Sequence, residues 1–299
     1  MICVGVDAGG TSTVAALSKD GAYLRQVRGP GANATTLGVH DAADVIIATI
    51  REVLDGAVLD SIHAGAAGAG RERIAAELRT LIGAAFAGAH VAVGDDAAIA
   101  LRAAISEGDG AVLIAGTGST AYAVHGERAA RIGGLGPLAG DEGSAFWIGM
   151  QAVKLYGRVL DGRAARDETT DLVARALSAR DRASYLDALY DAPADPARIA
   201  ALAPSIIAFA GKGNRASTKI TQQAAQELGD LVRAALRSVE LLDHSPSVAL
   251  AGGLFAENSL LSFLLETRMN ADVPGVAIVK GGDEPARGAL RLAERAAAP

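Results

Sequence analysis

Two short segments with the same pattern constrain the fold of this 299-residue chain more than any other feature. Residues 2–17 contain an apolar run, a loop with Gly9, Gly10 and three hydroxyl residues, and a second apolar run. Residues 111–124 repeat this order around Gly116-Thr117-Gly118-Ser119-Thr120. Because each half of the chain opens with a strand, a glycine- and hydroxyl-rich loop and another strand, we predict an α/β protein. Its two halves are expected to be copies of one fold that face each other across a cleft.

The first loop has the composition of a phosphate-binding site. We expect Gly9 and Gly10 to adopt positive φ angles and to leave backbone N–H groups uncovered. Thr11 and Ser12 add hydroxyl donors for phosphate oxygens. Asp7 ends the preceding strand, where a carboxylate can hold a hydrated Mg²⁺ beside a phosphate. A tight β-hairpin with a glycine turn explains this loop equally well when it is taken alone, and the second copy of the pattern favours a nucleotide.

The composition is that of a compact globular protein with two domains of ordinary size. The chain is 50% hydrophobic, and its apolar runs are too short for a transmembrane helix. We expect a cytoplasmic protein, because Cys3 is the only cysteine and the first residues lack the basic start of a secretory signal. A net charge of −6 argues against a nucleic-acid partner, and the histidines match no metal-ligand spacing.

Strand and helix patterns alternate along both halves of the chain. The polar, glycine-containing segment 106–110 separates a predicted N-terminal lobe, residues 1–108, from a C-terminal lobe, residues 109–299. Further along, the sequence predicts a turn at Asp191-Ala192-Pro193 and a helix from Glu257 to Met269. A final helix is predicted for 284–297, where Pro285 is a typical first residue, and this helix could pack back on the N-terminal lobe.

Asp95 and Asp96 lie where a predicted strand ends and a predicted helix begins. An aspartate at this position is usually an N-cap that accepts hydrogen bonds from the first helical N–H groups. A pair of aspartates leaves one carboxylate for other chemistry. It could accept the proton of a substrate hydroxyl as a phosphoryl group arrives.

Three further motifs suggest binding of a polyol and of a flat ring. Asp141 and Glu142 lie between two glycines and suit hydrogen bonding to neighbouring sugar hydroxyls, although Asp141 or Ser144 could instead cap the following helix. Asn33 supplies both a donor and an acceptor, but a lone loop asparagine is more often a turn residue. Gly252-Gly253 follows a strand and would let a ring approach the backbone, or would simply form a turn.

Together these segments resemble the actin/hexokinase/Hsp70 superfamily. More narrowly, the chain resembles the BadF/BadG/BcrA/BcrD-type ATPase family and its N-acetylglucosamine and glucosamine kinase branch. The resemblance implies a two-lobed, ribonuclease H-like fold with duplicated domains and an interlobe cleft. It covers nearly the whole chain and rests on these segments: Asp7-Ala-Gly-Gly-Thr11, Asn33, Asp96-Ala-Ala, Gly116-Thr-Gly-Ser119, the run Gly133 to Gly149 that contains Gly-Asp-Glu-Gly-Ser-Ala-Phe-Trp-Ile, and Ala251-Gly-Gly253.

The resemblance also implies a role for each matching residue. Asp96 would be the catalytic base, and Asp7 would position Mg²⁺ through water. The phosphates of ATP would be bound by Gly9, Gly10, Thr11, Ser12, Thr117 and Gly118, and its adenosine by Gly252 and Gly253. The sugar would be bound by Asn33, Asp96, Gly118, Leu135 and Asp141.

The function implied is ATP-dependent transfer of the γ-phosphoryl group to a hydroxyl, O6 by expectation, of N-acetylglucosamine or glucosamine. Two positions depart from the pattern of N-acetylglucosamine kinases: Leu135 stands where those enzymes often have Trp, and Thr120 where an Asn can contact the sugar. N-acetylmuramic acid or another hexose therefore remains an alternative acceptor, and a non-catalytic sugar or nucleotide sensor an alternative function. The branch of reductase activators that ligate an iron–sulfur cluster is disfavoured, because Cys3 stands alone. A monomer and a homodimer both stay open.

Overall fold

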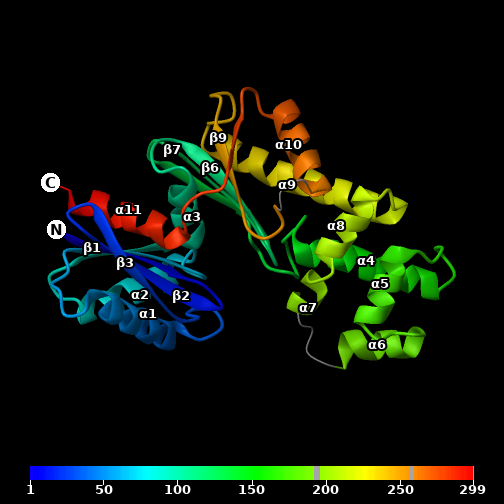
Figure 1. Ribbon diagram of the computed structural model, residues 1–299, viewed down its shortest axis with the longest axis horizontal. Helices are drawn as coiled ribbons and strands as arrows, with labels where there is room; N and C mark the ends of the chain where they lie inside the picture. Colours follow the sequence, from blue (N-terminus) through cyan, green and yellow to red (C-terminus); the bar gives the residue numbers. More distant parts are fainter. Residues whose placement is uncertain (192–195, 256–258, 299) are drawn as a thin grey trace. The chain divides into compact units, whose positions relative to one another are not determined.

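The structure is a computed structural model, and it describes residues 1–191, 196–255 and 259–298 (Figure 1). The chain divides into two compact units. The first unit contains residues 1–108 together with 279–299, and the second contains residues 109–278. The predicted turn at Ala192-Pro193 and the predicted helix start at Glu257 lie outside the described residues.

The first unit is built on a five-stranded sheet of order β3-β2-β1-β4-β5. Its strands are β1 (Ile2–Ala8), β2 (Ser12–Lys19), β3 (Ala22–Pro30), β4 (Ser61–Ala66) and β5 (His90–Asp95). β1, β2 and β3 form an antiparallel meander, whereas β4 and β5 run parallel to β1. The carboxyl ends of three strands therefore meet at one edge of the sheet, where loops commonly form ligand sites in α/β folds.

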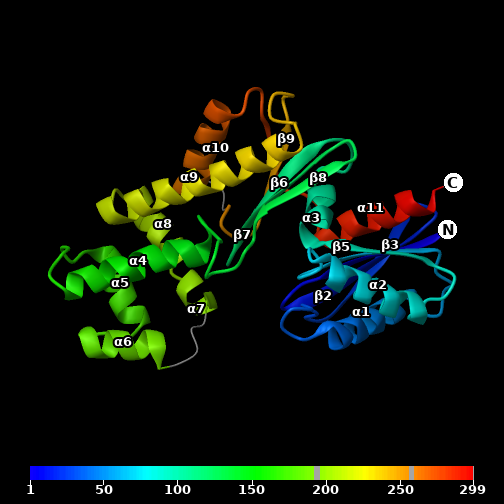
Figure 2. The ribbon, with the colours of Figure 1, turned by 180° about the vertical axis from the view of Figure 1, so that it is seen from behind.

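Helices cover both faces of this sheet (Figures 1 and 2). Val4 and Val6 face one side and share a core with α1 (Val39–Leu54) and α2 (Glu72–Ala85). The alternate residue Cys3 faces the other side and packs, with Val14, against α11 (Pro285–Ala297). α3 (Asp96–Ala104) lies on that second side and contacts α11. The alternation of strand side chains thus supplies two apolar faces, and one of them is buried by the end of the chain.

The second unit repeats the same sheet. Its strands are β6 (Gly110–Ala115), β7 (Ser119–His125), β8 (Arg128–Gly133), β9 (Ser247–Ala251) and β10 (Ala277–Lys280), of which β10 runs across the boundary between the units. Their order, β8-β7-β6-β9-β10, matches β3-β2-β1-β4-β5 strand for strand. β6 pairs antiparallel with β7 and parallel with β9, as β1 does with β2 and β4. The predicted α/β class with two copies of one fold is confirmed.

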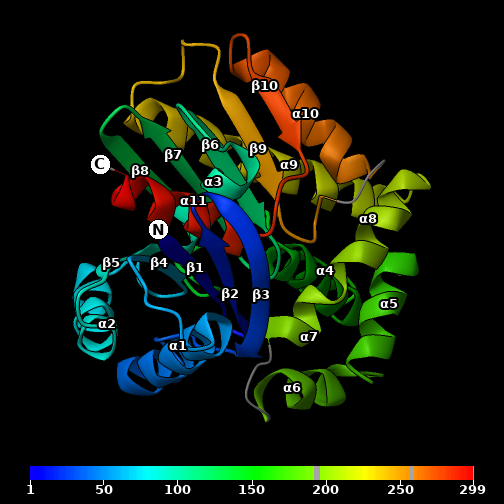
Figure 3. The ribbon, with the colours of Figure 1, turned by 60° about the vertical axis from the view of Figure 1, so that its left-hand side comes forward.

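Helices make up the rest of the second unit. They are α4 (Ala145–Leu160), α5 (Glu168–Ala176), α6 (Arg182–Tyr190), α7 (Pro196–Ala200), α8 (Ala203–Gly211), α9 (Arg215–Ser238) and α10 (Leu260–Asp272). α9 packs across one face of the sheet, and α10 lies beside it (Figure 3). A single core joins strands and helices through fully buried side chains such as Leu113, Ile148, Tyr156 and Leu228. Of the helices in the described residues, none is long and apolar enough to cross a membrane.

Candidate functional site

The first glycine loop, residues 9–12, includes the first residue of β2 and connects Ala8 of β1 to Thr13 of β2, which pair with each other. It is closed by a hydrogen bond from the Gly9 N–H to the Ser12 carbonyl at 3.0 Å. Neither Gly9 nor Gly10 has a positive φ, so the expected left-handed turn is wrong. A connection of this length reverses the chain without a left-handed residue. At Gly10, no atom outside the neighbouring residues lies within 4 Å of the place where a side chain would begin, so this side of the backbone is uncovered, whereas the Gly10 carbonyl packs against Gly31.

Arg28 is a functional candidate that the sequence did not reveal. It lies on β3, and its guanidinium Nη1 donates a hydrogen bond to Ser12 Oγ at 2.8 Å. Strand register places Val14 between Arg28 and Asp7, so the two charged residues share one row and one face of the sheet. Only the register of β3 brings this cation to the loop, and no local pattern in the sequence records that register.

Asp7 lies near the end of β1, where its carboxyl group is half-buried. Burial raises its pKa from 3.8 to about 6; Arg28 opposes this rise and Glu284 adds to it. In the part of the chain that the structure describes, no group of three or more acidic, histidine or cysteine side chains could hold a metal. Asp7 therefore fits a Mg²⁺ ion whose remaining ligands are water and phosphate oxygens.

The Asn33 segment lies directly beside the first glycine loop. The Ala32 N–H donates to the Gly9 carbonyl at 2.9 Å, and the Ala34 N–H donates to the Ala67 carbonyl at 3.3 Å. Asn33 Oδ1 accepts hydrogen bonds from both the N–H, at 2.9 Å, and the hydroxyl of Thr35. Asn33 is therefore a turn residue, which was one of the two roles considered for it. Its side-chain amide nitrogen is the group that could donate a hydrogen bond to a ligand.

Asp95 and Asp96 have different structural roles at the same edge of the sheet. Asp95 is the N-cap of α3, because its Oδ1 accepts a hydrogen bond from the Ala97 N–H at 2.8 Å. Asp96 is the first residue of the helix, where the helix dipole favours a charged carboxylate. The register aligns Ala66 with both Ala8 and Asp95. Asp7, Asn33 and the aspartate pair therefore belong to one edge of the first unit.

The second glycine loop, residues 116–118, is fixed by the start of α4. The Ala145 and Phe146 N–H groups donate to the carbonyls of Gly116 and Thr117 at 2.9 and 3.2 Å. Ser144 is the N-cap of α4, with its Oγ accepting from the Trp147 N–H at 3.1 Å. The capping alternative therefore applies to Ser144, and Asp141 is left for another role.

Asp141 lies against the second glycine loop and is 8% exposed. The Ser119 N–H donates to its Oδ1 at 3.3 Å, and a side chain on Gly118 would begin 2.9 Å from both carboxylate oxygens. Burial raises the pKa of Asp141, while the Ser119 and Gly136 N–H groups oppose this rise. Its φ of 59° lies in the left-handed region, which is uncommon outside glycine and concentrates at functional sites.

A cavity of ≈ 330 Å³ opens beside Asp141. It is lined by the 116–120 loop, Arg131, Gly134, Gly136 and Asp141, among others. Arg131 is a second cation that the sequence did not single out. Leu135 is 71% exposed and is not part of this lining.

The two glycines of the Gly252-Gly253 turn have different surroundings. Gly252 has a φ of 102°, and a side chain there would overlap the Ala115 carbonyl. Gly253 is open on its side-chain face and, with Leu254, lines a cavity of ≈ 360 Å³. The other walls are mostly apolar and come from α8 and the start of α10, as suits a flat base.

The two sheets of equal strand order, each with a glycine- and hydroxyl-rich loop between its first two strands, define a class of α/β proteins with a duplicated fold. Within that class the chain belongs to the BadF/BadG/BcrA/BcrD ATPase family, which matches residues 4–293. The family resemblance predicted from the sequence is confirmed.

Named relatives match this chain along nearly its whole length. An N-acetylmuramic acid/N-acetylglucosamine kinase from Clostridium acetobutylicum is 28% identical, over 97% of each chain. An N-acetyl-D-glucosamine kinase from Dictyostelium discoideum is 25% identical, over 98% of this chain and 97% of its own. The crystal structure of a candidate N-acetylglucosamine kinase from Chromobacterium violaceum superposes with a TM-score of 0.74 at 26% identity, covering 97% and 98% of the two chains.

A more distant structure supports the fold alone. A ROK family glucokinase from Streptomyces griseus, solved with glucose and AMPPNP, has a TM-score of 0.58 and 16% identity, over 99% of this chain and all of its own. The two five-stranded sheets are therefore shared with sugar kinases outside the family.

Proposed function

We propose that this protein is an ATP-dependent sugar kinase that transfers the γ-phosphoryl group to O6 of N-acetylglucosamine or glucosamine. The proposal rests above all on one observation. Two glycine- and hydroxyl-rich loops occupy equivalent positions in two copies of one fold, and each lies beside a partly or fully buried carboxylate, Asp7 or Asp141. The relatives named as kinases of N-acetylated amino sugars support the same acceptor class.

The two loops and the Gly252-Gly253 turn account for ATP. Loop 9–12 and Thr117-Gly118 bind the phosphates through backbone N–H groups and hydroxyls, and the apolar cavity beside Gly253 takes the adenosine. Asp7 holds hydrated Mg²⁺, which when bound neutralises charge on the β- and γ-phosphates. We place the protein in the cytoplasm, where ATP is available.

The acceptor is assigned to the remaining polar residues. Asp96, the first residue of α3, takes the proton of the attacking hydroxyl, and Asp95 caps the helix. In the second unit, Gly118 and Asp141 line the cavity that we propose for the sugar. Leu135 of that unit and, in the first unit, Asn33 are further proposed sugar-binding residues. In this arrangement the chain's own residues position the acceptor and accept its proton, and the phosphate loops stabilise the charge that develops on the transferred group.

N-acetylmuramic acid is a second candidate acceptor. Arg131 lines the same cavity as Asp141, and its guanidinium could pair with the carboxylate that this sugar carries. A sensor that binds without transfer is less well supported, because it would have no need of a base such as Asp96.

A coupled assay of ADP release tests the proposal directly. The acceptors compared are glucosamine, N-acetylglucosamine, N-acetylmuramic acid, N-acetylmannosamine and glucose, each with ATP and Mg²⁺. Release that depends on N-acetylglucosamine or glucosamine is the expected result. Preference for N-acetylmuramic acid would select the second candidate, and binding of ATP without release on any sugar would favour the sensor.

A further inference from the structure

A basic cavity of ≈ 390 Å³ lies in the helical part of the second unit. Its walls come from the end of α4, the turn at 161–163 and the start of α6. Four basic side chains and one acidic side chain line it, a formal charge of +3 in a chain whose net charge is −6. The charged lining residues are Lys154, Arg158, Asp161, Arg163 and Arg182.

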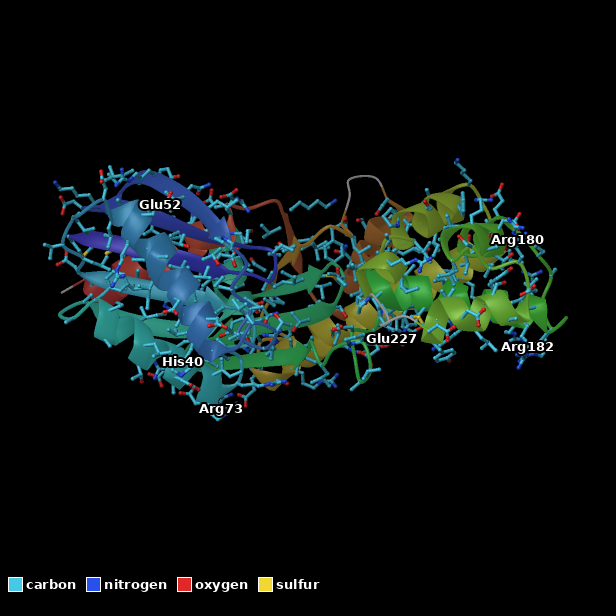
Figure 4. The ribbon with its side chains drawn as sticks, turned by 90° about the horizontal axis from the view of Figure 1, so that it is seen from below. His40, Glu52, Arg73, Arg180, Arg182 and Glu227 are labelled. Carbon is cyan, nitrogen blue, oxygen red and sulfur yellow. The ribbon has the colours of Figure 1, made fainter. Side chains whose placement is uncertain are left out.

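Asp161 holds two of these guanidinium groups in place. Its Oδ2 accepts from Arg163 Nη2 at 2.6 Å, and its Oδ1 accepts from Arg182 Nη1 at 2.8 Å. Both arginines lower the pKa of Asp161, so it stays ionised. Figure 4 shows Arg182 projecting from the end of this helical region. One carboxylate therefore orders two cations from separate segments but neutralises the charge of only one.

Lys154 and Arg158 supply two of the three net positive charges. They lie four residues apart on α4, on the same helical face, where like charges repel. Both are exposed, and the ion pairs found in the described part of the chain include neither of them. An anion bound between them would replace this repulsion with attraction.

One wall of the cavity is apolar, and its side chains are held in place by contacts with α4. The Tyr185 hydroxyl donates to the Val153 carbonyl at 3.0 Å, and its ring meets the Tyr156 ring edge-on at 5.8 Å. Gly157 allows this close crossing, since a side chain there would begin 3.1 Å from the Tyr185 hydroxyl. Leu160 and Leu186 complete an apolar surface for the non-ionic part of a ligand.

The cavity is distinct from the candidate kinase site. The first residues of α4 hydrogen-bond to the carbonyls of Gly116 and Thr117, whereas its last turns line the basic cavity. Lys154, the first residue of α4 in the cavity lining, follows Ala145 by nine residues, which is about 14 Å along the helix axis.

We propose that this cavity binds the phosphate group of a small phosphorylated metabolite. A phosphate carries two negative charges and three acceptor oxygens, which suit several guanidinium forks and one ammonium group better than a monocarboxylate does. The volume lies within the range of small-molecule sites. The same chemistry is presented by free phosphate and by a sugar phosphate, and the site does not depend on the proposed kinase function.

Calorimetric titration tests the proposal, with a non-hydrolysable ATP analogue present to fill the glycine loops. The probes are inorganic phosphate, glucosamine 6-phosphate and acetate. We expect saturable binding of phosphate or of the sugar phosphate, and much weaker binding of acetate. The double variant Lys154→Gln with Arg158→Gln is expected to lower the affinity by at least roughly tenfold, because two charge-assisted contacts are lost.

The matched control removes two positive charges elsewhere in the same unit. Arg166 pairs with Asp171 outside the cavity, and Arg237 is an exposed residue in the last turn of α9. Arg166→Gln with Arg237→Gln should leave the affinity unchanged. Equal losses in both double variants, no loss in either, acetate binding as tight as phosphate binding, or no saturable binding of any probe would each overturn the proposal. Tighter binding of glucosamine 6-phosphate than of inorganic phosphate would identify a sugar phosphate as the better source of the phosphate group.

Discussion

Asp95 and Asp96 are adjacent in the sequence, yet the start of α3 assigns them separate roles. Asp95 accepts the Ala97 N–H and thereby caps the helix. Asp96 begins the helix itself, and its side chain lies at the edge of the sheet that also carries Asp7. The pair therefore provides an internal control for any test of general-base catalysis.

Asp96→Asn is expected to lower kcat by roughly 10²- to 10⁴-fold while leaving ATP and sugar affinities nearly unchanged, because an amide cannot accept the proton. Steady-state kinetics with the best acceptor measure kcat, and calorimetry measures the affinities. Asp95→Asn is the control. Since Asn is an equally good N-cap, kcat should stay within about threefold of wild type. If the two variants lost activity equally, Asp96 would not be the base.

Asp7 is expected to make stability depend on pH. Its folded-state pKa of about 6 lies above the ordinary value of 3.8. The stabilisation from keeping this carboxyl protonated is therefore complete below pH 3.8 and is lost as the pH rises through 6. In the protein without ligands, burial of the ionised Asp7 carboxylate therefore lowers the free energy of unfolding.

Asp7→Asn removes that cost while preserving shape. We expect the variant to have a higher free energy of unfolding than wild type at pH 8. This gain at pH 8 should be about 1–2 kcal/mol larger than the gain at pH 4.5. Urea unfolding of the first unit at both pH values, without Mg²⁺ or nucleotide, measures the difference. A destabilised variant, or an equal advantage at both pH values, would contradict the assigned burial of Asp7. The same variant should lose kinase activity.

At the scale of elements, local sequence patterns predicted the positions of helices far better than they predicted which elements pack together. The helix predicted for 284–297, with Pro285 as a typical first residue, matches α11 closely. The meander of β1, β2 and β3 brings Arg28 to Ser12, and the packing of α4 against α6 gathers the four cations of the basic cavity. Such groupings depend on register and tertiary packing, which no short segment encodes.

The packing of α11 against α3 requires glycine at position 288. A side chain there would overlap the Ile99 carbonyl, which belongs to a helix backbone and cannot rotate away. Gly288→Ala should therefore destabilise the first unit by about 2–4 kcal/mol, an overpacking cost. Urea unfolding monitored by circular dichroism measures the change.

Gly83→Ala is the matched control for this prediction. Gly83 also lies within a helix, α2, but no atom lies within 4 Å of a side chain placed there. Alanine should stabilise that helix by about 0.5–1 kcal/mol, because glycine loses more backbone freedom on folding. Equal effects of the two substitutions would mean that helix propensity, and not contact with α3, governs position 288.

At the scale of the whole molecule, the first unit is discontinuous in sequence. The chain leaves it after Gly108, builds the second unit and returns at Val279. Only the returning segment supplies α11, which buries the sheet face formed by Cys3, Val14 and Ala16. The second unit, by contrast, has its core within one continuous stretch.

This discontinuity predicts how the chain can be divided. Residues 109–280, which keep β10 paired with β9, should fold alone and unfold cooperatively on heating. Residues 1–108 alone should lack a cooperative transition, because one apolar sheet face stays bare. Joining residues 1–108 to residues 281–299 should restore the cooperative transition. A flexible linker of about eight residues suffices, since the Asp283 N–H already bonds the Ala103 carbonyl at 3.1 Å. Circular dichroism melting of the three polypeptides is the measurement, and a cooperative transition in residues 1–108 alone would show that α11 is dispensable for the first unit.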